Sequence, residues 1–198
     1  MRPISRVMIG LAALALLVLL FVPIWRIDLS APQYPEGLSL QIFADRFEGD
    51  VERVNGLNHY IGMAHIRNET FPEFQLLPKV LVALSVLGVG AALWGRRILL
   101  VAGLITLSLF GAWALWRMWD WGYAYGHNLD PRAAIKVEGM AYQPPLIGHK
   151  QLLNFDAWST PDTGGWILFG VMGLLAGVYF LEIRDMRTRR KQRRTSLS

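Results

Sequence analysis

The sequence of 198 residues contains no cysteine, which excludes disulfide bonds, thiolate metal sites and catalysis by a thiol. A chain without cysteine also suits an oxidising compartment. The sequence further lacks a Ser-His-Asp order, an HExxH motif, a phosphate-binding loop and a pair of carboxylates at acid/base spacing. We therefore expect that the protein is not an enzyme.

Hydrophobic residues make up 53% of the chain and are concentrated in four blocks, which is typical of a membrane protein. A helix needs about 20 apolar residues to cross a hydrocarbon core about 30 Å thick. The first block begins like a secretory signal but has no small-residue cleavage site, so we interpret it as a retained anchor. The predicted segments are a transmembrane anchor in 1–24, transmembrane helices in 78–95, 98–117 and 165–183, extracytoplasmic loops in 25–77 and 118–164, and a basic cytoplasmic tail in 184–198.

Basic residues predict the direction in which the helices cross the membrane. Seven of the twenty Lys and Arg residues lie in the last fifteen positions, and others flank the first block and separate the second from the third. The positive-inside rule places all these flanks in the cytoplasm, so both termini are inside and both long loops face outward. The tail has no folded basic and aromatic patch beside it, which predicts contact with the lipid bilayer and no nucleic acid partner.

The predicted membrane segments contain no ionisable residue in their interior, so the usual signs of transport or proton relay are missing. Lys79 and Glu182 lie at segment ends, where long side chains reach the interface. No histidine is embedded to ligate a haem, and no pair of broken helices indicates a transporter site. The aromatic run over 113–127 is interpreted as an interfacial belt that continues into a loop, rather than as a pigment or quinone pocket.

Both outer loops are too long for connectors and too rich in apolar residues to be disordered. Alternation over 38–42 predicts a strand, and residues 133–142 predict another. An Asn-Gly pair at 55–56 predicts a turn, after which Asn58 is expected to cap a short helix. The expected fold is an α-helical membrane protein with four transmembrane helices, N-in/C-in, and a small mixed α/β extracytoplasmic cap built from the two loops.

The stretch "NHYIGMAHI" places soft metal ligands close together. His59 and Met63 are four residues apart and share a helix face, while His65 requires the helix to end, which Gly62 favours. Imidazole and thioether without a thiol suit copper, with zinc held by imidazole and carboxylate as the alternative. In the ordinary interpretation the histidines only form hydrogen bonds and Met63 fills the core. The predicted metal ligands are His59, Met63, His65, Met140 and His149.

The strings "APQYPEGLSLQIF", "VNGLNHYIGM" and "YQPPLIGHKQLLNFDAWSTPDTGG" resemble small multi-pass membrane proteins that accompany bacterial nitrous oxide reductase systems. Those systems mature a periplasmic copper enzyme. The resemblance covers both outer loops and implies an accessory protein of the bacterial cytoplasmic (inner) membrane that binds or passes copper. Its implied partners are other membrane or periplasmic proteins of the assembly system. The alternative is a non-metal scaffold or docking subunit of a bacterial membrane complex.

Overall fold

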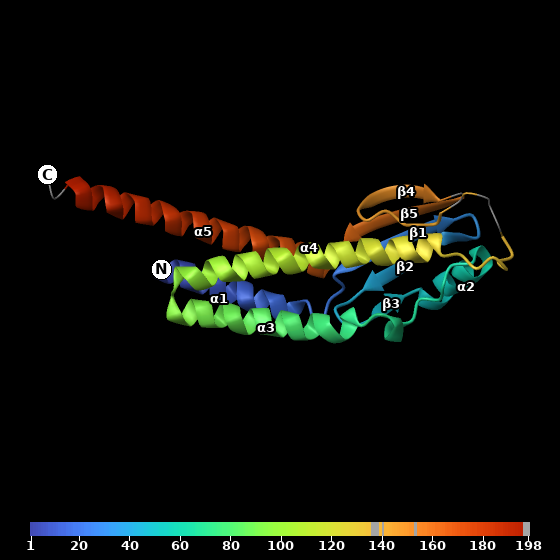
Figure 1. The fold of residues 1–198 in the computed structure, drawn as a ribbon, viewed down its shortest axis with the longest axis horizontal. Coiled ribbons are helices and arrows are strands. Elements are labelled where there is room, and N and C mark those ends of the chain that lie inside the picture. The colour runs from blue at the N-terminus through green and yellow to red at the C-terminus, as the bar shows by residue number, and fades with distance from the viewer. Residues whose placement is uncertain (136–138, 140, 153, 196–198) are drawn as a thin grey trace.

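The structure, a computed structural model, describes residues 1–135, 139, 141–152 and 154–195. It consists of a helical bundle with a sheet and a short helix at one end (Figure 1). The N-terminus, the turn between the second and third bundle helices and the C-terminus lie at the other end. The bundle helices, which lie side by side, are α1 (Pro3–Val18), α3 (Glu73–Trp94), α4 (Arg97–His127) and α5 (Thr163–Thr195).

Three of the described helices are long and apolar enough to cross a membrane: α3, α4 and the part of α5 from Thr163 to Thr188. The first predicted segment forms α1, which is shorter at 16 residues. It ends early because the chain turns to enter the sheet, where Ile24 N–H donates to Ile42 O at 2.8 Å. The helix nevertheless packs between α3 and α5, and its side chains contribute to the core of the bundle.

A five-stranded antiparallel sheet joins the two long loops that were predicted to face outward, in the order β3-β2-β1-β5-β4. The strand predicted over 38–42 is confirmed as part of β2, in which Leu38 and Leu40 are buried. The sheet therefore confirms that the loops fold together with mixed α and β structure. Its strands are β1 (Trp25–Ala31), β2 (Tyr34–Ile42) and β3 (Phe47–Gly49) from the first loop, and β4 (Gly148–Leu152) and β5 (Phe155–Pro161) from the second.

The central strand pair, β1 and β5, connects the sheet to the bundle. Strand β1 follows α1 and strand β5 precedes α5, and Trp25 is paired with Pro161 where the two strands leave the bundle. The Trp25 indole N–H donates to Ser159 Oγ at 2.8 Å, and Ser159 Oγ donates to Leu146 O at 2.9 Å. This pairing places the end of α1 and the start of α5 next to each other, where the two central strands meet the bundle.

Two local predictions for the first loop are wrong. The Asn-Gly pair at 55–56 forms no turn, and Asn58 does not cap a helix, because both lie inside α2 (Val51–Ile61). The helix begins after Asp50 instead, and Gly62 ends it. Tertiary contacts explain the difference, because Asn55 and Asn58 are buried and bond to the chain that follows the helix rather than to its first turn.

The prediction of a loop after residue 117 is also wrong, because α4 continues for ten more residues to His127. Met118, Trp121 and Tyr125 recur at helical spacing and pack against the apolar face of the sheet. The Trp121 ring lies 5.8 Å from the ring of Phe47 and 5.4 Å from that of Phe71. This packing stabilises the helix beyond its apolar block (Figure 1).

The strand expected over 133–142 is not observed in the part that the structure describes. Residues 136–138 and 140 lie outside the described residues, and the others form turns or irregular chain. Both described strands of the second loop come later, as a hairpin of β4 and β5. At the other end of the protein α5 continues through most of the basic segment, to Thr195.

The expectation that Glu182 reaches the interface is wrong, because this residue is only 1% exposed. Its carboxylate accepts hydrogen bonds from Ser5 Oγ at 2.7 Å, from the Arg2 backbone N–H at 2.9 Å and from Arg97 Nε at 2.8 Å. Glu182 therefore joins α1, α4 and α5 at the end of the bundle opposite the sheet. A buried carboxylate needs such partners, since desolvation without them is strongly unfavourable.

Candidate functional site

The end of α2 determines where the residues of "NHYIGMAHI" lie. Gly62 adopts φ 80°, a left-handed conformation that ends the helix and turns Met63 out of the helical register. A Cβ at Gly62 would lie 2.9 Å from Ala133 Cβ and 3.0 Å from Asp130 N. The two outer loops meet at this point, where Asp130 N–H donates to Gly62 O at 2.8 Å.

His59 and His65 form an exposed pair beside this turn. Their ring centroids are 6.2 Å apart with an interplanar angle of 77°. Two imidazoles that share an ion have their centroids about 5 to 6 Å apart, depending on the angle at the metal, because each metal–nitrogen bond is about 2.0 Å long. The backbone of His65 is fixed on both sides, by Tyr125 Oη donating to His65 O at 3.2 Å and by Asn55 Oδ1 accepting from Ile66 N at 2.7 Å.

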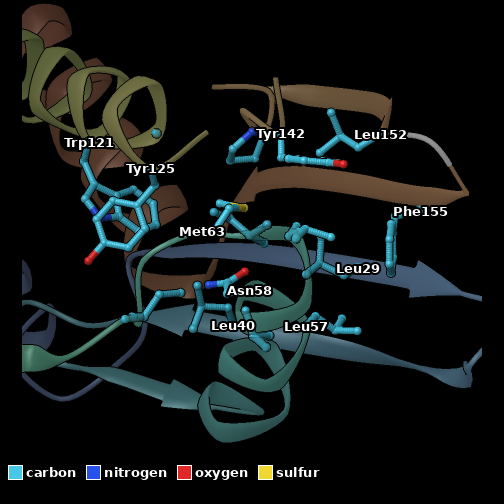
Figure 2. Close-up of a pocket in the computed structure, with 16 residues that line it drawn as sticks. Leu29, Leu40, Leu57, Asn58, Met63, Trp121, Tyr125, Tyr142, Leu152 and Phe155 are labelled. Atoms are coloured by element: carbon cyan, nitrogen blue, oxygen red, sulfur yellow. The ribbon is translucent and has the colours of Figure 1, made fainter. Parts of the chain in front are cut away.

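Met63 lies on the wall of an apolar pocket, whereas His59 and His65 do not line it (Figure 2). The pocket lies between α2, α4 and the sheet and has a volume of about 80 Å³. Both strings "VNGLNHYIGM" and "YQPPLIGHKQLLNF" contribute to its walls. Its lining residues are Ile27, Leu29, Leu40, Val54, Leu57, Asn58, Ile61, Met63, Ile66, Trp121, Gly122, Tyr125, Tyr142, Pro144, Leu152 and Phe155.

Asn58 is a polar side chain in this apolar wall. It is 5% exposed, and its Nδ2 donates to Ala64 O at 3.3 Å. Figure 2 shows the amide among the labelled pocket residues beneath Met63. Asn55, one helical turn earlier, instead uses both amide atoms to bind the backbone of Ile66, at 2.7 and 3.0 Å.

Tyr142 and Trp121 line the pocket, and the side chain of each carries a polar atom that is buried in the protein. The Tyr142 hydroxyl and Trp121 Nε1 are buried, and neither has a hydrogen-bond partner in the described part of the chain. Tyr142 is held against α4 by its backbone N–H, which donates to Gly126 O at 2.9 Å. This approach requires glycine at 126, because a Cβ there would lie 2.3 Å from Gln143 N.

The other predicted ligands lie elsewhere. His149 Nε2 is 2.6 Å from Asp156 Oδ1 across the β4–β5 hairpin, and its ring stacks on Trp158 with centroids 4.3 Å apart. Met140 lies outside the described residues. The structure therefore brings together His59 and His65 and places Met63 beside them in the chain. Within the described ranges, no group of three or more His, Asp or Glu side chains is arranged to hold a metal ion.

Two charged residues of the second loop, Asp130 and Arg132, lie at the α2 turn, where Asp130 N–H donates to Gly62 O. Asp130 Oδ1 accepts hydrogen bonds from the Arg132 backbone N–H at 2.8 Å and from Arg132 Nε at 3.3 Å. The hydrogen bond and the charge of Asp130 raise the pKa of the Arg132 guanidinium above its ordinary value. Arg132 and Asp130 therefore form an exposed ion pair beside the turn.

Sequence reasoning did not find the pocket or its polar atoms. The sequence does carry one signal, because Met118, Trp121 and Tyr125 recur at intervals of three and four and so share a helix face. Because residues 118–127 were interpreted as part of a loop, this shared helix face was not recognised from the sequence. The contributions of Asn58 and Tyr142 depend on contacts between the two loops, which no local pattern reveals.

Searches of protein-family models, curated proteins and solved structures find no match to the chain.

Proposed function

We propose that the protein is a membrane-anchored accessory protein that binds copper on an outer cap and passes it on during maturation of a periplasmic copper enzyme. The proposed cap is the sheet with α2 and the end of α4. The basic flanks support this orientation, because the N-terminus, the α3–α4 turn at Arg96 and the C-terminus all lie at the bundle end opposite the sheet (Figure 1). With these flanks in the cytoplasm, α1 is the fourth crossing and the cap faces the periplasm.

The observation that supports copper is the exposed pair of His59 and His65, with ring centroids 6.2 Å apart. Imidazole binds copper in both oxidation states, and a thioether favours Cu(I). Metal transfer requires ligands that a partner can reach, and this pair is on the surface of the cap. Met63 is the third candidate ligand, although its side chain is on the pocket wall.

The proposed recipient is a copper enzyme of the nitrous oxide reductase type, acting with other membrane or periplasmic proteins of its assembly system. The resemblance of both outer loops to proteins of such systems supports this choice. The two resembling strings that meet at the pocket are also the segments that carry His59, Met63 and His149, so the shared sequence is concentrated on the cap.

Copper competition against a chromogenic Cu(I) chelator tests this proposal on the full chain in detergent. We expect about one Cu(I) per protein, and a fall in affinity of about a hundredfold, or about 2.7 kcal/mol, in His59→Ala and in His65→Ala. His127→Ala is the matched control, because its exposed ring stacks on Tyr123 and does not belong to the pair. Met63→Leu should weaken binding less than either change in the pair. Equal, weak binding by the wild type and all variants would end the proposal.

A docking subunit is the second candidate function, and an exposed stripe along α4 favours it. The stripe continues beyond the predicted membrane end at residue 117, where Trp119 and Tyr123 are exposed and stack with centroids 5.5 Å apart. Exposed aromatic side chains outside the bilayer are typical of protein interfaces. The stripe consists of Ile98, Ile105, Leu109, Trp116, Trp119 and Tyr123.

Co-purification with native membrane partners distinguishes the two functions. A scaffold retains its partners after exhaustive copper chelation and loses them in a Trp119→Ala/Tyr123→Ala double variant. A copper-dependent partner contact is lost on chelation and in His59→Ala. If the partners are retained both by the double variant and after chelation, neither the α4 stripe nor copper at the His59–His65 pair has a role in partner binding.

A further inference from the structure

We infer that the apolar pocket between α2, α4 and the sheet binds the end of an uncharged amphipathic molecule of the bilayer, through a carbonyl oxygen. Neither His59 nor His65 lines this pocket, so occupancy there does not depend on copper at the pair. Figure 2 shows that side chains from α2, α4 and the sheet converge on the same space, with Met63 near its centre.

The wall of the pocket selects against charge. None of the described residues that line it carries a charged side chain, and the lining is dominated by aliphatic and aromatic groups. An ionised group in such a space would lose its hydration without gaining a counter-charge. The ligand is therefore uncharged over the part that enters, with an apolar body that fits beside Leu40, Ile61 and Phe155.

Unpaired polar atoms in the wall indicate what else the ligand carries. Tyr142 is only 3% exposed, yet its hydroxyl has no partner among the described residues, and the same holds for the buried Nε1 of Trp121. Buried polar groups in proteins are usually hydrogen-bonded, so these two atoms require an explanation. An indole N–H is only a donor, and a phenol hydroxyl can donate. A ligand with an acceptor oxygen satisfies either group, and a carbonyl is an uncharged group that does so.

The position of the pocket indicates where the ligand comes from. A second, smaller cavity shares Ile27, Trp121 and Pro144 with the pocket and is also lined by Met118 and Trp119. These two α4 residues follow directly after the predicted membrane segment, which ends at 117. The smaller cavity, which Gln143 also lines, thus lies between the end of the predicted membrane segment and the pocket. Molecules dissolved in the bilayer reach this entrance without crossing water.

The size of the pocket limits how much of the ligand enters. Its volume of about 80 Å³ is smaller than the engineered cavity of about 150 Å³ that holds benzene. One ring edge or a few methylene groups with their carbonyl fit, and the rest of the molecule remains outside. Two neutral components of a bilayer have this chemistry: the head group of a quinone and the ester end of an acyl chain.

Native mass spectrometry of the full chain released from detergent tests the inference with three probes. The probes are a ubiquinone with one isoprene unit, methyl decanoate and n-decane, which has no oxygen. We expect one bound molecule of the quinone or the ester per protein and no retention of decane. Binding of only the quinone identifies a ring ligand, and binding of only the ester identifies an acyl ligand. Binding of neither probe, or decane retained equally, would overturn the inference.

Variants determine whether the bound probe occupies this pocket. Tyr142→Phe should weaken binding about fivefold, as expected for one hydrogen bond, and should leave the free protein as stable as before or more so. Gly122→Leu should abolish binding, because a Cβ there makes only ordinary contacts, with Pro144 at 3.9 Å and Gln143 Cγ at 4.0 Å, and a longer side chain fills the space. Gly111→Leu is the control on the same helix, where an added Cβ meets nothing within 4 Å. Unchanged affinity in both Tyr142→Phe and Gly122→Leu would contradict the site.

Discussion

The side chains of Arg97 and Glu182 form a salt bridge with Arg97 Nε 2.8 Å from Glu182 Oε2. The two residues lie on α4 and α5, at the end of the bundle opposite the sheet, and Ser5 of α1 donates to the same carboxylate. One carboxylate therefore fixes the relative positions of three helices. The helical bundle consequently contains a polar structural centre at this end, although its apolar blocks contain no ionisable residue in their interior.

Replacing Glu182 should destabilise the bundle. Glu182→Ala leaves Arg97 and Ser5 without their acceptor, and we expect a loss of about 3 kcal/mol in the free energy of unfolding. Glu182→Gln keeps an acceptor oxygen and should lose less. Thermal unfolding in detergent, followed by tryptophan fluorescence, measures both. Arg184→Gln, an exposed change on the same helix, is the control, and an equal effect of all three variants would contradict the structural role of the carboxylate.

Gly62→Ala should destabilise the α2 turn. The residue has φ 80°, and an added Cβ would approach Ala133 Cβ to 2.9 Å, so we expect a loss of about 2 kcal/mol or more. The matched control is Gly56→Ala in the middle of α2, where a Cβ meets nothing within 4 Å. That change should stabilise by about 0.5–1 kcal/mol through helix propensity. Chemical denaturation of the two variants measures the difference, and changes of the same sign would be inconsistent with the turn.

Asn55→Ala should lower both stability and copper affinity. The change leaves the buried N–H and C=O of Ile66 without their partner, at an expected loss of about 2 kcal/mol. Because Ile66 fixes the backbone next to His65, the His59–His65 geometry should loosen as well. By contrast, His59→Ala should reduce copper affinity with little effect on unfolding. Parallel measurements of unfolding and Cu(I) competition separate the two effects, and normal copper affinity in a destabilised Asn55→Ala would disprove the link.

Single introduced cysteines test the proposed orientation, because the natural chain contains none. Glu52→Cys on the exposed face of α2 should react with a membrane-impermeant maleimide added from the periplasmic side. Thr188→Cys, exposed near the end of α5, should react only after the inner compartment is opened. Reversed labelling would refute the orientation and, with it, the periplasmic location of the cap. The cysteine-free parent chain provides the background signal.

Hydrophobic blocks and alternation predicted a large part of this fold. The apolar blocks form α1, α3, α4 and α5, and the alternating residues 38–42 form part of β2. Both signals are local, because burial of a helix or of one face of a strand directly determines which positions are apolar. Helix ends were predicted less well. Pro78 lies inside α3 rather than at its start, and α4 extends past residue 117, because contacts with the sheet rather than local sequence determine these ends.

The local structure around the candidate ligands was predicted in part. Gly62 ends the helix as expected, and the rings of His59 and His65 lie near each other, although the helix that carries His59 begins earlier than predicted. The local turn rule for Asn-Gly failed at 55–56, because burial of Asn55 against Ile66 favours the helix. The pocket requires β1, β2, α2 and α4 to meet, and this arrangement depends on pairing between distant segments that one-dimensional periodicity does not encode.

The pairing of β1 with β5 has a consequence for biosynthesis. Trp25 and Pro161 are partners in the sheet although 136 positions separate them (161 − 25). Strand β1 therefore emerges from the ribosome long before β5 has been synthesised. Until then one edge of β1 has no partner strand, and such an edge is prone to wrong pairing. Completion of the sheet must therefore await translation of β5, which directly precedes α5.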